Sequence, residues 1–286
     1  MIYDVNGNAI GTLYDVEGDQ LASAYDVEGN LLSVTQPTYP MTVMTFNVQW
    51  WEGINSNESM LRGIFEGYDP DIIGFQEFQK ASADTIPTLA GTVLSADYPY
   101  VNMGNYGNKN ALASKYQMTQ FTTVPHTTQT MDGQSYSTAH ITFHGKDILL
   151  LTSHLTTTSN EAAKVEQAHE VFEAVQDADY FIIFADFNTI FDTIQDTEYT
   201  TIMKQFVDAG YHCANCTAQH GFFYTWTAGT EITDPWSTAW DACDHIITSA
   251  NISIDQVVAD DTKITVAGQT GQSIDHLPLI AYLTVN

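Results

Sequence analysis

Apolar residues run in short stretches from Met41 to the end of the chain, and most of these stretches are too short to be helices. Runs of four to eight apolar or alternating positions, bounded by turn residues, are typical of buried and half-buried strands. The sequence predicts strands at Thr42–Val48, Asp71–Phe75, Tyr136–Phe143, Asp147–Ser153, Tyr180–Ala185, Ile246–Thr248 and Leu279–Val285.

Other segments repeat their apolar residues at helical spacing. The longest predicted helix runs from about Asn160 to Ala178, and Thr158 with Glu161 has the spacing of a capping box at its start. Two further helices are predicted near Glu58–Glu66, ending at Gly67, and near Tyr199–Ala209, ending at Gly210. The apolar stripe of the long helix consists of Val165, Ala168, Phe172 and Val175. The alternation over residues 42–286 is typical of a two-sheet sandwich flanked by helices, and by itself it indicates one α/β domain.

The first 36 residues have a different pattern, a repeat with a period of 11. The triplet Tyr-Asp-Val begins at Tyr3, Tyr14 and Tyr25, and each copy is followed by a glycine turn. The repeat predicts a small β-appendage of strand–turn–strand units, and Pro37 and Pro40 mark a linker over residues 37–41. Its acidic residues allow two interpretations. One is an attachment or oligomerisation module, with Ca²⁺ as a possible ligand, and the other is a solvated appendage without a ligand.

Polar residues gather at the ends of the predicted strands of the large domain, where solubility does not require them. They are Asn47, Glu77, His154, Asp186, Asn188, Asp244, Asp275 and His276. If the strands are neighbours, these residues meet at one edge. Glu77 with Asn47 and Asp275 fits the sparse oxygen ligand set of Mg²⁺, and Asp186 could orient or deprotonate a water molecule. An Asp–His pair could direct a charged imidazole toward a phosphate. The set suits phosphodiester cleavage.

Six short segments resemble, in order and spacing, the signature blocks of the endonuclease/exonuclease/phosphatase family. They are Thr45-Phe46-Asn47, Gln76-Glu77, Ser153-His154-Leu155, Ala185-Asp186-Phe187-Asn188, Asp244-His245-Ile246 and Asp275-His276-Leu277-Pro278. That family includes deoxyribonuclease I, exonuclease III-type abasic endonucleases, neutral sphingomyelinases and inositol polyphosphate 5-phosphatases. The resemblance covers residues 41–286 and implies a four-layered sandwich of two mixed β-sheets flanked by helices, with the site at one edge.

The resemblance also implies a role for each matching residue. Glu77 would be the principal metal ligand, with Asn47 and Asp275 near the ion. Asp186 would position the attacking water, and Asn188 would bind the phosphate. His154 would contact the phosphate or leaving group, and Asp244 with His276 would form a dyad. Asn110 and Lys109 lie in a segment that resembles the family's middle block and would face the substrate. Trp226 would either pack in the core or form a wall of the substrate groove.

This sequence departs from the family pattern in ways that leave every expected metal ligand in place. Ala185 replaces the usual glycine before the aspartate, and Ile274 replaces the usual serine before Asp275. Lys164 and Gln167 stand where many relatives have arginine. We therefore expect an active enzyme.

Charge restricts the substrate. The chain has 35 acidic residues against 8 Lys and Arg, a formal net charge of -27, so it cannot bind nucleic acid through a general basic surface. A nuclease would need local contacts through metal ions and a few donors. No apolar run reaches the length of a membrane span, and the first residues lack the features of a secretory signal. We expect a cytoplasmic or particle- or surface-associated protein, without deciding between these locations.

Three cysteines are too few for a disulfide framework. Cys213, Cys216 and His220 have plausible zinc spacing, but a single Cys-x-x-Cys motif without a second pair favours a small-loop disulfide or two buried thiols over zinc.

Together the residues and the resemblance predict a Mg²⁺- or Mn²⁺-dependent phosphodiester hydrolase. Nucleic acid is the favoured substrate, and cleavage of DNA as an endonuclease is the favoured reaction. One alternative is a phosphodiesterase or phosphatase that acts on a lipid headgroup or a small phosphate. Another is a binding or structural protein that works through its repeats.

Overall fold

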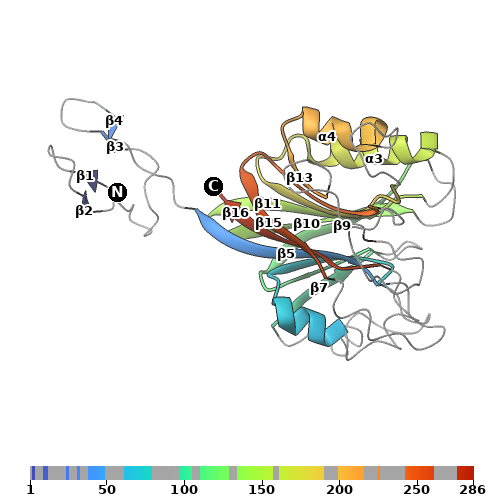
Figure 1. Ribbon diagram of the computed structural model, residues 1–286, viewed down its shortest axis with the longest axis horizontal. Coiled ribbons are helices and arrows are strands. Elements are labelled where there is room, and N and C mark those ends of the chain that lie inside the picture. The colour runs from blue at the N-terminus through green and yellow to red at the C-terminus, as the bar shows by residue number, and fades with distance from the viewer. Residues whose placement is uncertain are drawn as a thin grey trace.

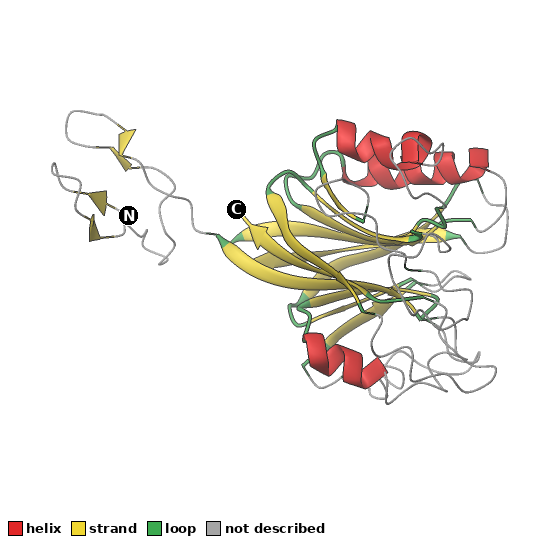
Figure 2. Cartoon of the chain, in the orientation of Figure 1, coloured by secondary structure: helices red, strands yellow, loops and turns green. Residues whose placement is uncertain are grey.

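The computed structural model describes residues 38–48, 61–78, 94, 97–104, 110–128, 134–156, 161–189, 199–215, 225, 242–260 and 276–286, together with the backbone of four short strands nearer the N-terminus. Within these ranges two mixed six-stranded sheets pack face to face, and helices cover the outer face of each sheet (Figures 1 and 2). This arrangement confirms the predicted four-layered α/β sandwich.

The first sheet has the strand order β15-β16-β5-β6-β8-β7. Its strands are β5 (Tyr39–Asn47), β6 (Ile72–Gln76), β7 (Tyr100–Met103), β8 (Ala111–Ser114), β15 (Ile252–Ala259) and β16 (Leu279–Val285). Only β5 and β6 pair in parallel in this sheet.

The second sheet has the strand order β13-β14-β12-β11-β10-β9. Its strands are β9 (Met118–Pro125), β10 (Ser135–Phe143), β11 (Lys146–His154), β12 (Phe181–Asp186), β13 (His212–Ala214) and β14 (Asp244–Thr248). Only β11 and β12 pair in parallel here, and helix α3 (Glu161–Val175) connects them. Each sheet therefore contains one parallel pair at its centre.

Three apolar clusters fill the spaces between the four layers. The central cluster, which includes Val43 and Phe184, lies between the sheets. A second cluster packs the helix over residues 61–68 on the first sheet. A third packs α3, the π-helical turn η1 (Tyr199–Met203) and helix α4 (Lys204–Asp208) on the second sheet. Removal of these apolar side chains from water is the main force that holds the layers together.

Gly74 in β6 allows the two sheets to approach closely. A Cβ atom at this position would lie 2.1 Å from the Cβ and 2.3 Å from the Cγ of Phe184 in β12. We expect Gly74→Ala to lower the free energy of unfolding by roughly 1–3 kcal/mol, because the stem of a buried ring cannot move without displacing its strand. Denaturant unfolding measures this change. Gly63→Ala is the control, since a Cβ there meets no atom within 4 Å, and equal stability of the two variants would contradict the expectation.

The first sheet begins earlier than the sequence predicts. The expected linker covers residues 37–41, but β5 already starts at Tyr39. Pro40 pairs with Thr284 of β16, whereas pairing with β6 begins only at Val43. A proline without an N–H group is tolerated at this position because the strand has a single neighbour there.

The predicted helices are present, but their ends differ. The helix over residues 61–68 continues through Gly67. The residue that follows the helix, Asp69, has a φ of 46°. Residues 58–60 lie outside the described residues. The segment after Tyr199 begins as the π-helical turn η1, continues as α4, and stops at Gly210, where φ is 81°. A glycine adopts this left-handed conformation without strain, as the sequence suggested.

Near the N-terminus the described backbone forms two hairpins. Strand β1 (Ile2–Tyr3) pairs with β2 (Ala9–Gly11), and β3 (Ala24–Tyr25) pairs with β4 (Leu31–Leu32). Both pairs are antiparallel. The proposed attachment, oligomerisation and Ca²⁺ binding of this segment remain predictions from sequence. In the described part of the chain, no helix is long and apolar enough to span a bilayer.

Candidate active site

The candidate site lies where the carboxyl ends of the two parallel strand pairs meet. In the second sheet, His154 of β11 pairs with Asp186 of β12, and Asp186 pairs with Asp244 of β14. The three residues therefore form a row across three adjacent strands. In the first sheet, Asn47 of β5 pairs with Gln76 of β6, and Glu77 follows directly. Ligand sites of α/β proteins commonly lie at such carboxyl ends.

The side-chain amide of Asn47 joins the two sheets at this point. Asn47 Nδ2 donates hydrogen bonds to Asp186 Oδ2 at 2.8 Å and to Glu77 Oε1 at 3.3 Å. Glu77 has a φ of 54°, a conformation that costs a non-glycine residue energy and is often found at functional sites. Asn47 thus holds two carboxylates from different strands close together.

Asp186 Oδ2 is the centre of the cluster. His154 Nε2 lies 3.4 Å from this oxygen and His276 Nε2 lies 3.6 Å from it. The other ring nitrogen of His276, Nδ1, lies 2.8 Å from Asp244 Oδ2. His154 Nδ1 lies 3.8 Å from Glu77 Oε1. Each imidazole therefore lies between two carboxylates. His154 lies between Glu77 and Asp186, and His276 lies between Asp186 and Asp244.

The pKa values of the three carboxylates are shifted in different directions. Burial alone would raise the pKa of Asp186, but His154, His276 and the hydrogen bonds from Asn47 and Asn188 lower it below its ordinary value. Burial raises the pKa of Glu77, and the attraction of His154 only partly offsets this. Burial also raises the pKa of Asp244, opposed by the charge of His276. Asp186 is therefore the carboxylate of the three that most readily stays ionised.

The donor set fits a divalent cation. Three carboxylates face two imidazoles, and no ion pair among the described residues joins one of these carboxylates to Lys or Arg. Oxygen ligands with excess negative charge suit a hard ion such as Mg²⁺. The Glu77 side chain is 16% exposed, whereas that of Asp186 is fully buried, so an ion can reach Glu77 more readily.

A second group of possible ligands overlaps this one. Asp186, Asp244 and His276 offer ligand atoms that lie within 4.8 Å of one another. The 2.8 Å contact between Asp244 and His276 Nδ1 indicates that these two atoms share a hydrogen. We therefore assign them to a hydrogen-bonded dyad and regard Glu77 as the better place for a metal ion.

The turn after β12 is held by hydrogen bonds from three directions. Asn188 has a φ of 49°, donates its backbone N–H to Asp186 Oδ1 at 2.9 Å, and donates its side-chain Nδ2 to the carbonyl oxygen of Leu155 at 2.9 Å. Lys164 Nζ donates to the carbonyl oxygen of Asn188, also at 2.9 Å. The turn links the end of β12 to the end of β11.

Three residues that support the site were not predicted from the sequence. Thr225 Oγ1 accepts a hydrogen bond from the backbone N–H of Asp244 at 2.9 Å. Thr189 Oγ1 donates to the carbonyl oxygen of Ala242 at 2.6 Å and lies 2.8 Å from His245 Nε2. His245 stands beside Asp244 inside a recognised block, and this adjacency was the available signal. Isolated threonines carry no comparable signal.

His245 makes the stability of the fold depend on pH. Burial lowers its pKa to about 4, whereas in the unfolded chain its pKa is about 6.5. As the pH falls below 6.5 the unfolded chain binds a proton that the folded protein does not, so stability decreases. Between pH 7 and pH 5 we expect this residue to cost roughly 2 kcal/mol. Urea unfolding of wild type and His245→Asn at both pH values tests this, and an equal loss in the two proteins would contradict it.

Asn110 precedes Ala111 of β8, which pairs with Phe75 of β6, so its backbone lies at the same end of the first sheet as Asn47 and Glu77. The Asn110 side chain is buried and donates to the carbonyl oxygen of Ser135 at 2.6 Å, and none of its described contacts is with the carboxylates. Its Oδ1 atom is buried without a hydrogen-bond partner in the described part of the chain. Asp275, Lys109, Trp226, Cys216 and His220 lie outside the described residues. Cys213 and Cys243 are buried, and Cys243 Sγ donates to the carbonyl oxygen of Thr189 at 3.5 Å.

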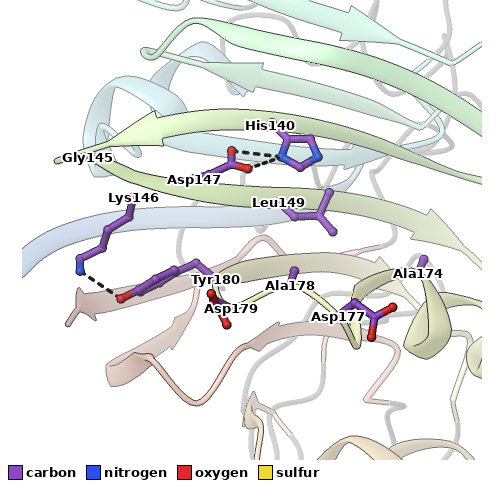
Figure 3. Close-up of a pocket in the computed structure, with 10 residues that line it drawn as sticks. All are labelled: His140, Gly145, Lys146, Asp147, Leu149, Ala174, Asp177, Ala178, Asp179 and Tyr180. Carbon is purple, nitrogen blue, oxygen red and sulfur yellow. Dashed lines mark hydrogen bonds and ion pairs between the residues drawn. The ribbon is translucent and has the colours of Figure 1, made fainter.

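A pocket lies at the opposite end of β11 from His154 (Figure 3). It is lined by residues of the β10–β11 turn and of the segment between α3 and β12, among them His140, Asp147 and Tyr180. His140 Nδ1 lies 3.0 Å from Asp147 Oδ2, and Lys146 Nζ donates to the Tyr180 hydroxyl at 3.0 Å. Asp147 and His154 are seven positions apart along β11, roughly 23 Å. This pocket is therefore remote from the carboxylate cluster.

Comparison with known proteins agrees with this fold. The model of the endonuclease/exonuclease/phosphatase family matches residues 44–266. A solved structure of a family protein from Bacteroides thetaiotaomicron is similar, with a TM-score of 0.66 and 17% identity, and the match covers 87% of this chain and 96% of that one. The human Nocturnin catalytic domain with bound sulfate has a TM-score of 0.64 and 16% identity over 87% of this chain and 97% of that one.

D. rerio TDP2, solved with a single-strand DNA product, has a TM-score of 0.62 and 15% identity over 85% of this chain and 98% of that one. No curated protein matches the sequence. The structural likenesses show the shared fold, and the family match covers most of the chain. The chain therefore belongs to the endonuclease/exonuclease/phosphatase family of metal-dependent phosphoester hydrolases.

Proposed function

We propose that this protein hydrolyses phosphodiester bonds with Mg²⁺ or Mn²⁺, and that DNA is its favoured substrate. The observation that carries the proposal is the contact of Asn47 with both Glu77 and Asp186, opposite the hydrogen-bonded pair of Asp244 and His276. An ion held by Glu77, with Asn47 and Asp275 beside it, would stabilise negative charge on the phosphoryl oxygens and favour an ionised water.

The protein's own groups have distinct parts in this reaction. Asp186, whose pKa is lowered, orients the attacking water and accepts its proton. Asp244 holds His276 through Nδ1, so that Nε2 points toward Asp186 and the phosphate beyond it. His154 contacts the phosphate or the leaving oxygen. The side-chain amide of Asn188, which uses one N–H on Leu155, binds a phosphoryl oxygen.

DNA is favoured because a similar protein, D. rerio TDP2, was solved with a single-strand DNA product. A specific observation favours a second candidate, a phosphodiester in a lipid headgroup or a small molecule. The described lysines are all engaged in contacts, Lys115 with Asp69, Lys146 with Tyr180, Lys164 with Asn188 and Lys204 with Asp208. With a net charge of -27, the chain repels a polyanion at long range.

Nicking of supercoiled plasmid DNA tests the first candidate. Wild type with Mg²⁺ or Mn²⁺ is expected to nick the plasmid, whereas EDTA, Asp186→Ala or His276→Ala abolishes nicking. Asp147→Ala in the remote pocket is the matched control and should be active. If DNA stays intact while a generic phosphodiester or a phospholipid is hydrolysed, the second candidate replaces the first.

Salt dependence separates the same two candidates quantitatively. On DNA, each phosphate that a basic group of the protein contacts steepens the fall of log affinity with log salt concentration by about one unit, whereas a small substrate gives a shallow slope.

If no ester is cleaved with either metal, and deletion of residues 1–36 removes the protein's biological effect, the function would lie in the repeats.

A further inference from the structure

Helix α3 buries polar residues where its sequence predicts an exposed face. The predicted stripe contained Val165 and Phe172, but both are only half-buried. Lys164 and Gln167 are buried instead, at 5% and 0% exposure, on the face that also carries Ala168. The helix therefore turns two long polar side chains toward the loops that follow β11 and β12.

The position of Lys164 is unfavourable unless its ammonium group has a specific partner. A buried lysine loses hydration, and a cation in the first turn of a helix is repelled by the positive end of the helix dipole. Lys164 is the fourth residue of α3, and its Nζ donates to the carbonyl oxygen of Asn188 at 2.9 Å. A charge-assisted hydrogen bond to a carbonyl is among the stronger polar contacts in a protein.

Asn188 transmits this contact to the site. It is held in a left-handed conformation, with its N–H on Asp186 Oδ1 and its side chain on the Leu155 carbonyl next to His154. The N–H, the side chain and the carbonyl of Asn188 are all hydrogen-bonded, and they connect Lys164 to the ends of β11 and β12. Gln167 supports the same region, since its Oε1 accepts a hydrogen bond from the Thr156 N–H at 2.8 Å.

We propose that Lys164 is a positioning residue: by fixing the Asn188 carbonyl it holds Asn188 and Asp186 in the arrangement that attack on the phosphate requires. This inference rests on the proposed phosphodiester hydrolysis. Lys164 acts through Asn188 and needs no contact with the substrate. Since substrate binding would also use other groups, loss of Lys164 should slow the chemical step more than it weakens binding.

The experiment compares Lys164→Met, Lys164→Arg and Lys204→Met. Methionine keeps most of the apolar stem but cannot donate, arginine restores a donor, and Lys204 is an exposed lysine paired with Asp208 on α4. With a generic phosphodiester and saturating Mn²⁺, Lys164→Met should lower kcat by at least about tenfold and change KM by less than about twofold. Lys164→Arg should recover most of kcat, and Lys204→Met should resemble wild type.

Hydrogen–deuterium exchange of the peptide that contains residues 187–189 gives a readout independent of activity. In Lys164→Met we expect faster exchange in this peptide and unchanged exchange in β5 and β16. Unchanged kcat, or uniformly faster exchange with a parallel loss of stability, would overturn the proposal. If wild type cleaves no phosphodiester, the proposed function fails by itself. The exchange data then decide whether Lys164 orders the Asn188 turn, and unchanged exchange at residues 187–189 would overturn that too.

Discussion

Asp186→Asn is expected to lower kcat by about 10³-fold or more while the protein stays folded. The substitution keeps the size of the side chain but removes the ionised oxygen around which Asn47, His154 and His276 gather. It also leaves one of two donors, Asn47 Nδ2 or the Asn188 N–H, without its acceptor. Steady-state hydrolysis of a generic phosphodiester at saturating metal measures the change in kcat.

Asp179→Asn is the matched control for this prediction, because Asp179 is an exposed carboxylate in the segment between α3 and β12. Its kcat should equal that of wild type. Circular dichroism and thermal unfolding establish that Asp186→Asn is folded under the assay conditions. A folded Asp186→Asn protein that retains more than about one tenth of wild-type kcat would exclude Asp186 as the group that activates water.

The ends of the central strands could be predicted from sequence because apolar runs stop abruptly at polar residues. Asn47, His154 and Asp186 each end such a run, and each is the last residue of its strand in the structure. The contact between Asn47 and Asp186 could not be predicted in this way. These residues are 139 positions apart, and their approach depends on how the two sheets pack, which no local pattern records.

The edges of both sheets were missed for a related reason. Strands β7, β9, β13 and β15, the four outermost strands, were not predicted, and the short inner strand β8 beside β7 was missed as well. An edge strand faces solvent on one side, so polar residues interrupt its apolar pattern, as Thr122 and Thr123 do in β9. The predicted stripe of α3 does pack on the second sheet, but the burial of Lys164 and Gln167 beside it was missed, because these side chains are buried by hydrogen bonds to loops that hydrophobicity cannot anticipate.

Asp244→Asn and His276→Gln are expected to lower kcat by about 10²-fold to 10³-fold each, with strongly non-additive effects in the double variant. Asp244 reaches the cluster through His276 Nδ1 at 2.8 Å, and only Nε2 of that ring points toward Asp186. If Asp244 acts by orienting the ring and keeping it charged, its removal has little further effect once the ring is gone. The double variant should then be close to His276→Gln alone. Rates of the four proteins on one phosphodiester substrate define the coupling.

The molecule contains a second Asp–His pair that serves as control for this cycle. Asp147 and His140 also interact through a histidine Nδ1 atom, at 3.0 Å, but in the pocket at the other end of β11 (Figure 3). Asp147→Asn should leave kcat unchanged, since an exposed pair contributes little to stability and lies far from the carboxylates. Additive losses for Asp244→Asn and His276→Gln would mean that the two residues act independently. In that case the dyad would have to be abandoned in favour of a shared metal site at Asp186, Asp244 and His276.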